Sequence, residues 1–269
     1  MHHRHLYSST PSTARRTVLH AALAVPLALG ITGHAAAQTA ATAFPSKTIR
    51  FVVPYPPGGP TDLMARLIQG ELGTRLGTTV VVVNKSGAGG NLGSAEVAKQ
   101  APADGYTLLL AASGPMAVNP SLYKSMGFDP LKDLAPVIQI SSFPLVLEVN
   151  TKLGVKTPQE LAALAKRPDS KLTFASAGNG TPQHLAGEML ARDAKRFVQH
   201  VPYKGSGPAI TAVAAGQVAA GMVTASSAAA MIAAGRVRAL AVTAPQRLPL
   251  LAGVPTVAER GLPVFAVEQ

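Results

Sequence analysis

The sequence predicts an α/β protein whose sheets are largely parallel. From Lys47 onward, short apolar runs rich in β-branched residues alternate with amphipathic segments that have helical periodicity. Glycine-rich turns join several of these runs to the segment that follows, as in strand-to-helix connections. The chain has no cysteine, and its length allows a buried core without disulfides.

The strand candidates are runs of mostly apolar or β-branched residues. They cover residues 49–53, 80–83, 107–110, 137–149, 172–175, 200–203, 218–223 and 238–242. The run 137–149 and the run 237–243 exceed the usual length of a single strand. Because no Gly/Ser linker separates two halves, we expect the chain to cross between two domains within these segments.

Helices are expected in the gaps between these strands. Leucines recur at helical spacing after Asp62, which predicts a helix that Thr61 or Asp62 caps. The alanine-rich stretch 209–234 is interpreted as two short helices around a strand, closed by Gly216 and Gly235.

Three glycine-rich turns, 55–62, 86–91 and 175–182, join a predicted strand to a predicted helix. In the last of them Thr181 is placed to cap a helix that begins at Pro182. Free N–H groups at such helix starts bind anions. Any one such turn is common in α/β proteins that bind nothing there. Two such turns in opposite halves of the chain favour a ligand site, because ligands of α/β sheets bind beyond the carboxyl ends of strands.

The N-terminus has the pattern of an export signal. A basic start is followed by an apolar run over 18–31 and by the small residues 35–37, which predicts cleavage near Ala37. The apolar run contains Pro26 and is too short for a membrane anchor, so we expect an exported, periplasmic protein. The pair Arg15 and Arg16 is compatible with export by the twin-arginine pathway as well as by the general secretory pathway.

The charge pattern excludes a nucleic-acid partner. Without residues 1–37 the chain has 21 Lys and Arg against 13 Asp and Glu, and these charges are diffuse. No window combines a basic cluster with interleaved aromatic residues. A positive field suits an anionic ligand, although a merely soluble basic surface explains the same balance.

Motifs for enzyme chemistry do not fit. Gly87 and Gly89 are followed by Leu92, where a dinucleotide fingerprint needs glycine or alanine. Phe174 stands two residues before Ser176, where a nucleophile elbow needs glycine. No phosphate loop of the Gly-Lys-Ser/Thr type occurs. The sequence therefore favours a binding protein over an enzyme.

Histidine usage gives no indication of a metal or cofactor. Only His184 and His200 remain outside the export signal, they are far apart in sequence, and no cysteine accompanies them. His184 follows the turn 175–182 closely, so we expect it to line a pocket or to make a structural hydrogen bond.

Several long motifs occur together and in a fixed order. They are 53–62 (VPYPPGGPTD), 87–91 (GAGGN), 104–108 (DGYTL), 175–188 (ASAGNGTPQHLAGE), 200–205 (HVPYKG) and 253–259 (GVPTVAE). In this order they resemble the Bug family, the solute receptors of tripartite tricarboxylate transporters. The resemblance covers about 45–269.

This resemblance implies a type II periplasmic binding protein-like fold, with two α/β lobes and a ligand cleft between them. The first lobe is expected to comprise 45–140, the second lobe 141–236, and residues 237–269 to return to the first. The implied ligand is a small organic carboxylate, and the implied partners are the membrane permease subunits of a tripartite transporter. We expect a monomer that binds no nucleic acid.

The expected ligand-binding residues lie in the turns that begin helices and at the ends of neighbouring strands. They are Gly58, Gly59, Pro60, Thr61, Asp62, Asn91, Ser113, Ser176, Gly178, Asn179, Gly180, Thr181, His184, Tyr203 and Thr224. Backbone N–H groups are expected to hold the anion, since neither main turn contains an arginine. Asp62 is expected to brace its helix rather than to contact the ligand.

Two departures from the family pattern affect these expectations. Residues 222–226 lack the aspartate that many relatives have there, so selectivity cannot be copied from them. The chain ends at Gln269, where the family normally continues with further elements of the first lobe, so we expect a shortened gene product. A receptor that signals to a membrane partner without transport, and a non-functional fragment, remain as alternatives.

Overall fold

The structure, a computed structural model, describes residues 43–193, 198–261 and 267–269. The predicted export signal and its cleavage site near Ala37 lie outside the described residues. All the elements named below lie within Pro45–Gln269. None of the helices in the described ranges combines the length and the apolar character that crossing a bilayer requires.

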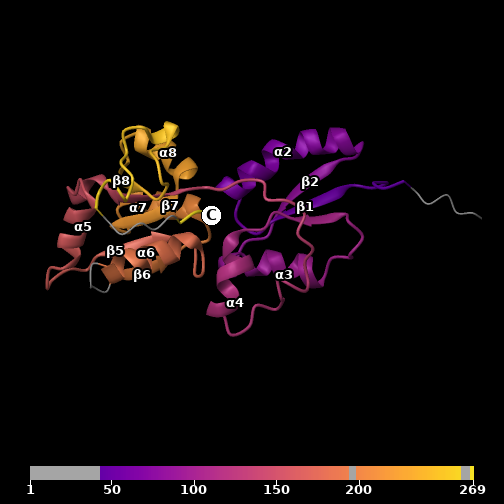
Figure 1. Cartoon of the computed structure of the whole chain (residues 1–269), viewed down its shortest axis with the longest axis horizontal. Coiled ribbons are helices and arrows are strands. Elements are labelled where there is room, and N and C mark those ends of the chain that lie inside the picture. Colours follow the sequence, from indigo (N-terminus) through magenta and orange to yellow (C-terminus); the bar gives the residue numbers. More distant parts are fainter. Residues whose placement is uncertain (1–42, 194–197, 262–266) are drawn as a thin grey trace, which may run out of the picture. The chain divides into compact units, whose positions relative to one another are not determined.

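The first lobe contains a parallel sheet of three strands in the order β2-β1-β3. Its strands are β1 (Ile49–Val53), β2 (Val80–Asn84) and β3 (Thr107–Leu109). Helix α2 (Pro60–Leu76) lies along β1 and β2, as Figure 1 shows. The remaining elements are η1 (Ala88–Gly90), α3 (Asn91–Lys99), the short π-helical turn η2 (Gly114–Val118) and α4 (Asn119–Leu122).

The start of α2 differs from the prediction. Gly59 is the N-cap, Pro60 is the first helical residue, and no side chain caps the helix. Pro60 explains the shift, because its fixed φ suits the first helical position and its missing N–H needs no partner there. Thr61 and Asp62 therefore lie inside the first turn rather than at its cap.

The second lobe contains a sheet of five strands in the order β6-β5-β7-β4-β8. Strands β5, β6 and β7 are parallel, whereas β4 is antiparallel to both β7 and β8. The strands are β4 (Leu145–Asn150), β5 (Thr173–Ser176), β6 (Gln199–Pro202), β7 (Ala220–Thr224) and β8 (Val237–Val242). The helices are η3 (Thr151–Leu153), α5 (Pro158–Ala165), α6 (Pro182–Asp193), α7 (Ser206–Ala215), α8 (Ala225–Ala233) and η4 (Pro249–Leu251).

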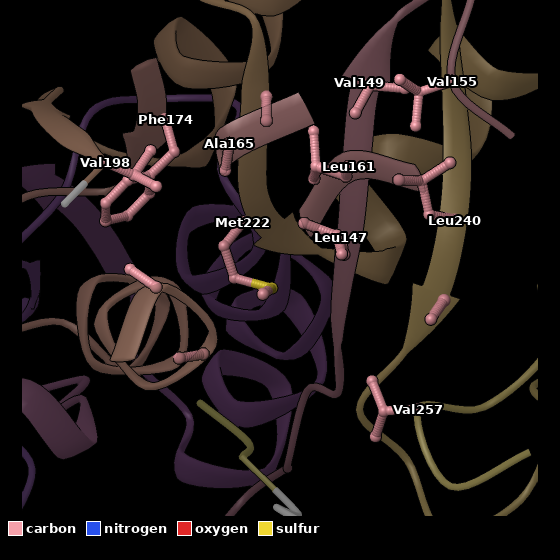
Figure 2. Close-up of a cluster of buried hydrophobic side chains, with 14 of the residues drawn as sticks. Leu147, Val149, Val155, Leu161, Ala165, Phe174, Val198, Met222, Leu240 and Val257 are labelled. Carbon is pink, nitrogen blue, oxygen red and sulfur yellow. The ribbon is translucent and has the colours of Figure 1, made fainter. Parts of the chain in front are cut away.

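Helices cover both faces of this second sheet, which explains why its strands are apolar on both sides. Side chains of α5 and α6 pack with Leu147 and Val149 of β4 on one face, and Figure 2 shows Met222 of β7 among them. Side chains of α7 and α8 pack with Val146 of β4 on the opposite face. The alternation along β4 follows from the period of two in a strand.

One charged residue lies within this apolar packing. Glu148 of β4 is fully buried, and neither carboxyl oxygen has a hydrogen-bond partner among the described residues. Its carboxyl lies opposite Gly221, where a Cβ atom would be 3.2 Å from Glu148 Oε1 and 3.0 Å from Val213 Cγ2. Burial raises the pKa of Glu148 to about 8.

Three details of the predicted organisation have clear outcomes. The predicted pair of helices within 209–234 is confirmed as α7 and α8, with Gly216 and Gly235 just beyond their ends. Of the long run predicted over 137–149, only the end forms a strand, because the ladder begins at Leu145, where β4 meets β7 and β8. Strand β8, predicted to return to the first lobe, pairs with β4 of the second sheet instead.

Candidate functional site

Two adjoining cavities form a cleft beside the first turns of α2 and α7. The narrow end is lined by residues of the β1–α2 loop, the β6–α7 loop, Ala177 and Gln269. The wide end, of about 190 Å³, is lined by the turn 87–90, Tyr123, residues 177–179 and residues 202–204. Tyr55 and Ala177 line both cavities, so the two ends adjoin each other.

Two helix starts face the narrow end. The N-caps of α2 and α7 are Gly59 and Gly205, and neither helix has a side-chain cap. Thr61 of α2 and Ser206 of α7 line the same cavity. The N–H groups of a first helical turn have no partner inside the helix, and the helix dipole adds positive potential there. The narrow end is therefore suited to an anionic group.

Asp62 braces the β1–α2 loop. Its buried carboxylate accepts hydrogen bonds from Gly58 N, Arg66 Nε and Asn84 Nδ2, each at 2.9 Å. Burial by itself would raise the pKa of this carboxyl, but the hydrogen bonds from Arg66, Gly58 and Asn84 hold the pKa below its usual value. Asp62 therefore remains ionised and holds the loop in the shape that exposes the helix start.

Replacing Asp62 by asparagine should destabilise the protein by about 1 to 3 kcal/mol at neutral pH, because a charged acceptor of three bonds is lost. The difference should shrink in acid, where the wild-type carboxylate is protonated as the pH falls through its lowered pKa. Thermal unfolding as a function of pH measures both effects. Asp169→Asn is the control, since Asp169 is 72% exposed and also pairs with an arginine. Unchanged stability with lost ligand binding would show that Asp62 contacts the ligand itself.

The β5–α6 loop is held by its own polar groups. Ser176 Oγ accepts from Gly178 N at 3.1 Å, and Thr181 Oγ1 donates to Gly178 O at 2.7 Å. Gly178 and Gly180 have φ of 129° and 78°, which favours glycine at both positions. Thr181 Oγ1 accepts a hydrogen bond from His184 N at 3.4 Å, which is consistent with the predicted capping role of Thr181. This loop presents Ala177, Gly178 and Asn179 to the wide end of the cleft.

The two histidines that are separate in sequence stack on each other behind this loop. The ring centroids of His184 and His200 are 4.2 Å apart, and the rings are inclined by 19°. Burial lowers the pKa of both imidazoles, and His184 adds to the effect on His200, whose pKa is about 4. Both rings are therefore neutral at physiological pH.

Glu188 lies near both rings, and together the three residues offer ligand atoms within 4.8 Å of one another. The hydrogen bonds argue against a metal role. Gly180 N donates to His184 Nδ1 at 3.3 Å, which places the proton of the neutral ring on Nε2, facing Glu188. His200 Nε2 is 2.6 Å from Ser176 Oγ. These rings therefore act as supports for the β5–α6 loop.

The two lobes touch at glycines, where a Cβ atom would clash with the opposite lobe. A Cβ atom on Gly180 would lie 1.8 Å from Asn119 Oδ1, and one on Gly89 would lie 2.2 Å from Asn179 O. Tyr123 Oη donates to Asn179 O at 3.2 Å in the same region. The β5–α6 loop, which lines the cleft, thus also contacts the first lobe.

The structure separates the predicted ligand-binding residues into four groups. Gly59, Pro60, Thr61, Gly178, Asn179 and Tyr203 line the cleft. Gly58, Asp62, Ser176, Thr181 and His184 hold the loops in place. A third group lies where the two lobes touch: Gly180 packs on Asn119, whose Nδ2 donates to Asn91 Oδ1. Ser113 comes directly before Gly114, which also packs on Gly180. Thr224 lines neither cavity, is fully buried and bonds Ser227.

Other cleft residues were absent from the prediction. They are Tyr55, 56–57, 87–90, Tyr123, Ala177, Pro202, Lys204, 205–208 and Gln269. The segment 205–208 carries a usable signal, since Gly-Ser-Gly-Pro is a further glycine-rich turn from a strand to a helix. Tyr123 and Gln269 carry no such local signal, because only long-range packing brings them to the cleft.

Comparison with known proteins identifies the family to which this fold and cleft belong. The family described as the tripartite tricarboxylate transporter family receptor, TctC, matches residues 64–268. The chain belongs to this receptor family. Protein BugT of Bordetella pertussis is 40% identical over 231 residues, which cover 86% of this chain and 71% of BugT.

Solved structures of receptors agree with this assignment. The periplasmic binding protein BugD superposes with a TM-score of 0.79 at 36% identity, over 84% of this chain and 75% of BugD. The R. palustris protein Rpa4515, solved with adipate, gives a TM-score of 0.80 at 36% identity over the same shares of the two chains. The predicted fold class of two α/β lobes is confirmed. The relatives of this chain are periplasmic solute-binding proteins rather than enzymes.

Proposed function

We propose that this chain, once exported, captures a small organic dicarboxylate in its cleft for a tripartite tricarboxylate-type transporter. The observation that carries the proposal is the pair of uncapped helix starts, α2 and α7, at the narrow end. They supply N–H donors and positive potential from both lobes to one carboxylate. Adipate bound to Rpa4515, which has a similar fold, supports the same ligand class.

The wide end is suited to the second carboxylate. Lys204 lines it together with Tyr55, Tyr123 and Tyr203. Within the part of the chain that the structure describes, no ion pair involves Lys204. The ammonium group of a lysine in this position would provide charge-assisted hydrogen bonds to a carboxylate. A ligand with two carboxylates separated by a short chain would thus contact both ends of the cleft.

The proposal is tested by thermal unfolding and calorimetry with adipate, malate and succinate, using hexanoate and arginine as comparison ligands. A dicarboxylate at about 100 times its Kd should stabilise the protein by about 2.7 kcal/mol. Arginine should stabilise the protein less than any of the dicarboxylates, because Lys204 would repel its guanidinium group instead of binding a second carboxylate. If no carboxylate binds, or if arginine binds better, the proposal is wrong.

Replacing Lys204 by methionine should weaken adipate binding by roughly 10- to 100-fold, as expected for a lost charge-assisted bond of about 1.5 to 3 kcal/mol. Hexanoate, which lacks the second carboxylate, should bind both proteins equally. Calorimetry with the two ligands measures the difference. Lys156→Met, at an exposed lysine of the second lobe that lines neither cavity, is the control. Equal losses for adipate and hexanoate would contradict this assignment of Lys204.

A further inference from the structure

A buried amide side chain lies directly behind the narrow end of the cleft. Gln183, in the first turn of α6, has no exposed surface. Its Nε2 donates to Gln269 Oε1 at 2.5 Å and lies 3.5 Å from Ser206 Oγ. Its Oε1 has no hydrogen-bond partner within the described residues. Both contacts of Gln183 are therefore with residues that line the narrow end.

Gln269 is fixed in the cleft by its backbone and by its side chain. Its N–H donates to Phe143 O at 2.9 Å, and Phe143 N donates to Gln269 O at 3.0 Å. Its side-chain Nε2 donates to Thr61 Oγ1 at 3.4 Å. The amide of Gln269 thus lies between Gln183 of the second lobe and the first turn of α2.

The fold alone does not explain Gln183. A buried amide whose oxygen has no partner costs free energy, and an apolar side chain of the same length would avoid that cost. Local rules of this kind are typically violated at functional sites. Because Gln183 Nε2 donates a hydrogen bond, the side-chain oxygen of Gln269 must face Gln183 to accept it. The amide nitrogen of Gln269, which is a donor, therefore faces Thr61 and the cavity.

We infer that Gln183 is a positioning residue that orients the amide of Gln269, and that Gln269 donates a hydrogen bond to an oxygen of the ligand at the narrow end. The inference rests on the proposed function. One N–H of Gln269 Nε2 is directed to Thr61 Oγ1, and the second supplements the N–H groups of α2 and α7. Gln269 would thereby favour ligands that carry an additional oxygen beside the bound carboxylate, as a 2-hydroxy acid does.

The test compares malate with succinate, which differ only in the 2-hydroxyl group. Gln183→Met and Gln269→Met should each weaken malate binding about tenfold and should reduce the preference for malate over succinate. The double variant should be no weaker than either single variant, because both changes remove the same donor. Gln217→Met, at an exposed glutamine, should leave both affinities unchanged.

Thermal unfolding separates positioning from a merely structural role. Gln183→Met should unfold at the same temperature as the wild type or higher, because the unpartnered oxygen is removed. If that variant does not fold, Gln269→Met still tests the donor, since Gln269 is only partly buried. Wild-type binding by both single variants, or additive losses in the double variant, would overturn the inference while leaving the proposed function intact. A wild-type protein that binds no carboxylate would overturn both.

Discussion

Replacing Gly180 by alanine should weaken adipate binding by roughly 10- to 100-fold while the protein stays folded. The new Cβ atom would lie 1.8 Å from Asn119 Oδ1, far below any normal contact distance. Asn119 cannot move aside easily, because it is fully buried and its Nδ2 donates to Asn91 Oδ1 at 2.6 Å. Such overpacking typically costs about 1 to 3 kcal/mol. Here it destabilises the arrangement in which the two lobes are in contact, and ligand affinity falls by the corresponding factor.

The control for this experiment is Gly154→Ala. Gly154 has φ of 73°, close to the 78° of Gly180, but a Cβ atom there would have nothing within 4 Å. Both variants therefore carry the same backbone cost, on the order of 1 kcal/mol, and only Gly180→Ala obstructs the contact between the lobes. Calorimetry with adipate and thermal unfolding of both variants measure the two effects separately.

Removing the obstructing side chain should restore binding. The double variant Gly180→Ala with Asn119→Ala removes the two closest contacts of the new methyl group and leaves the flexible end of Leu122 as the next, at 3.1 Å, so its affinity for adipate should recover most of the loss. Equal affinities in Gly180→Ala and Gly154→Ala would show that the glycine contact does not control the binding arrangement. No recovery in the double variant would assign the loss to the backbone instead.

The second large effect is expected at Glu148, whose carboxyl oxygens have no hydrogen-bond partner among the described residues. Replacement by glutamine should stabilise the protein at pH 8 by on the order of 4 kcal/mol, or roughly 10 °C in Tm. The reason is that the folded protein keeps this carboxyl protonated up to a pKa of about 8, whereas the unfolded chain ionises near the ordinary pKa of 4.5. The contribution of Glu148 to stability is therefore complete in acid and is lost as the pH rises through its folded pKa.

The measurement is thermal unfolding of the wild type and Glu148→Gln between pH 4 and pH 9. The two curves should nearly coincide below pH 5, where both side chains are neutral, and should separate as the pH rises. Glu71→Gln is the control, since Glu71 is 65% exposed and pairs with Arg75 on the surface of α2. A constant difference at every pH would mean that Glu148 ionises in the folded state near its usual value.

Local sequence patterns determined much of the architecture. Runs such as 49–53 and 80–83 are rich in apolar, β-branched side chains, so they favour strands of a parallel sheet. Turns such as 175–182 combine glycines at positive φ with a capping threonine and a proline at the first helical position. These are short-range effects, and several loops that line the cleft could be located from them.

The tertiary structure alone decided which polar side chains meet. His184 and His200 are 16 positions apart in the chain, yet they stack because β6 pairs with β5, the strand that leads into the loop before α6. The contacts of Gly180 with Asn119, and of Gln269 with Gln183 and Thr61, join segments separated by 61, 86 and 208 positions. No local pattern encodes such pairs, because each depends on how two independently formed elements pack. The sequence therefore located several of the cleft's loops, whereas packing decided which residues complete the cleft and which only support it.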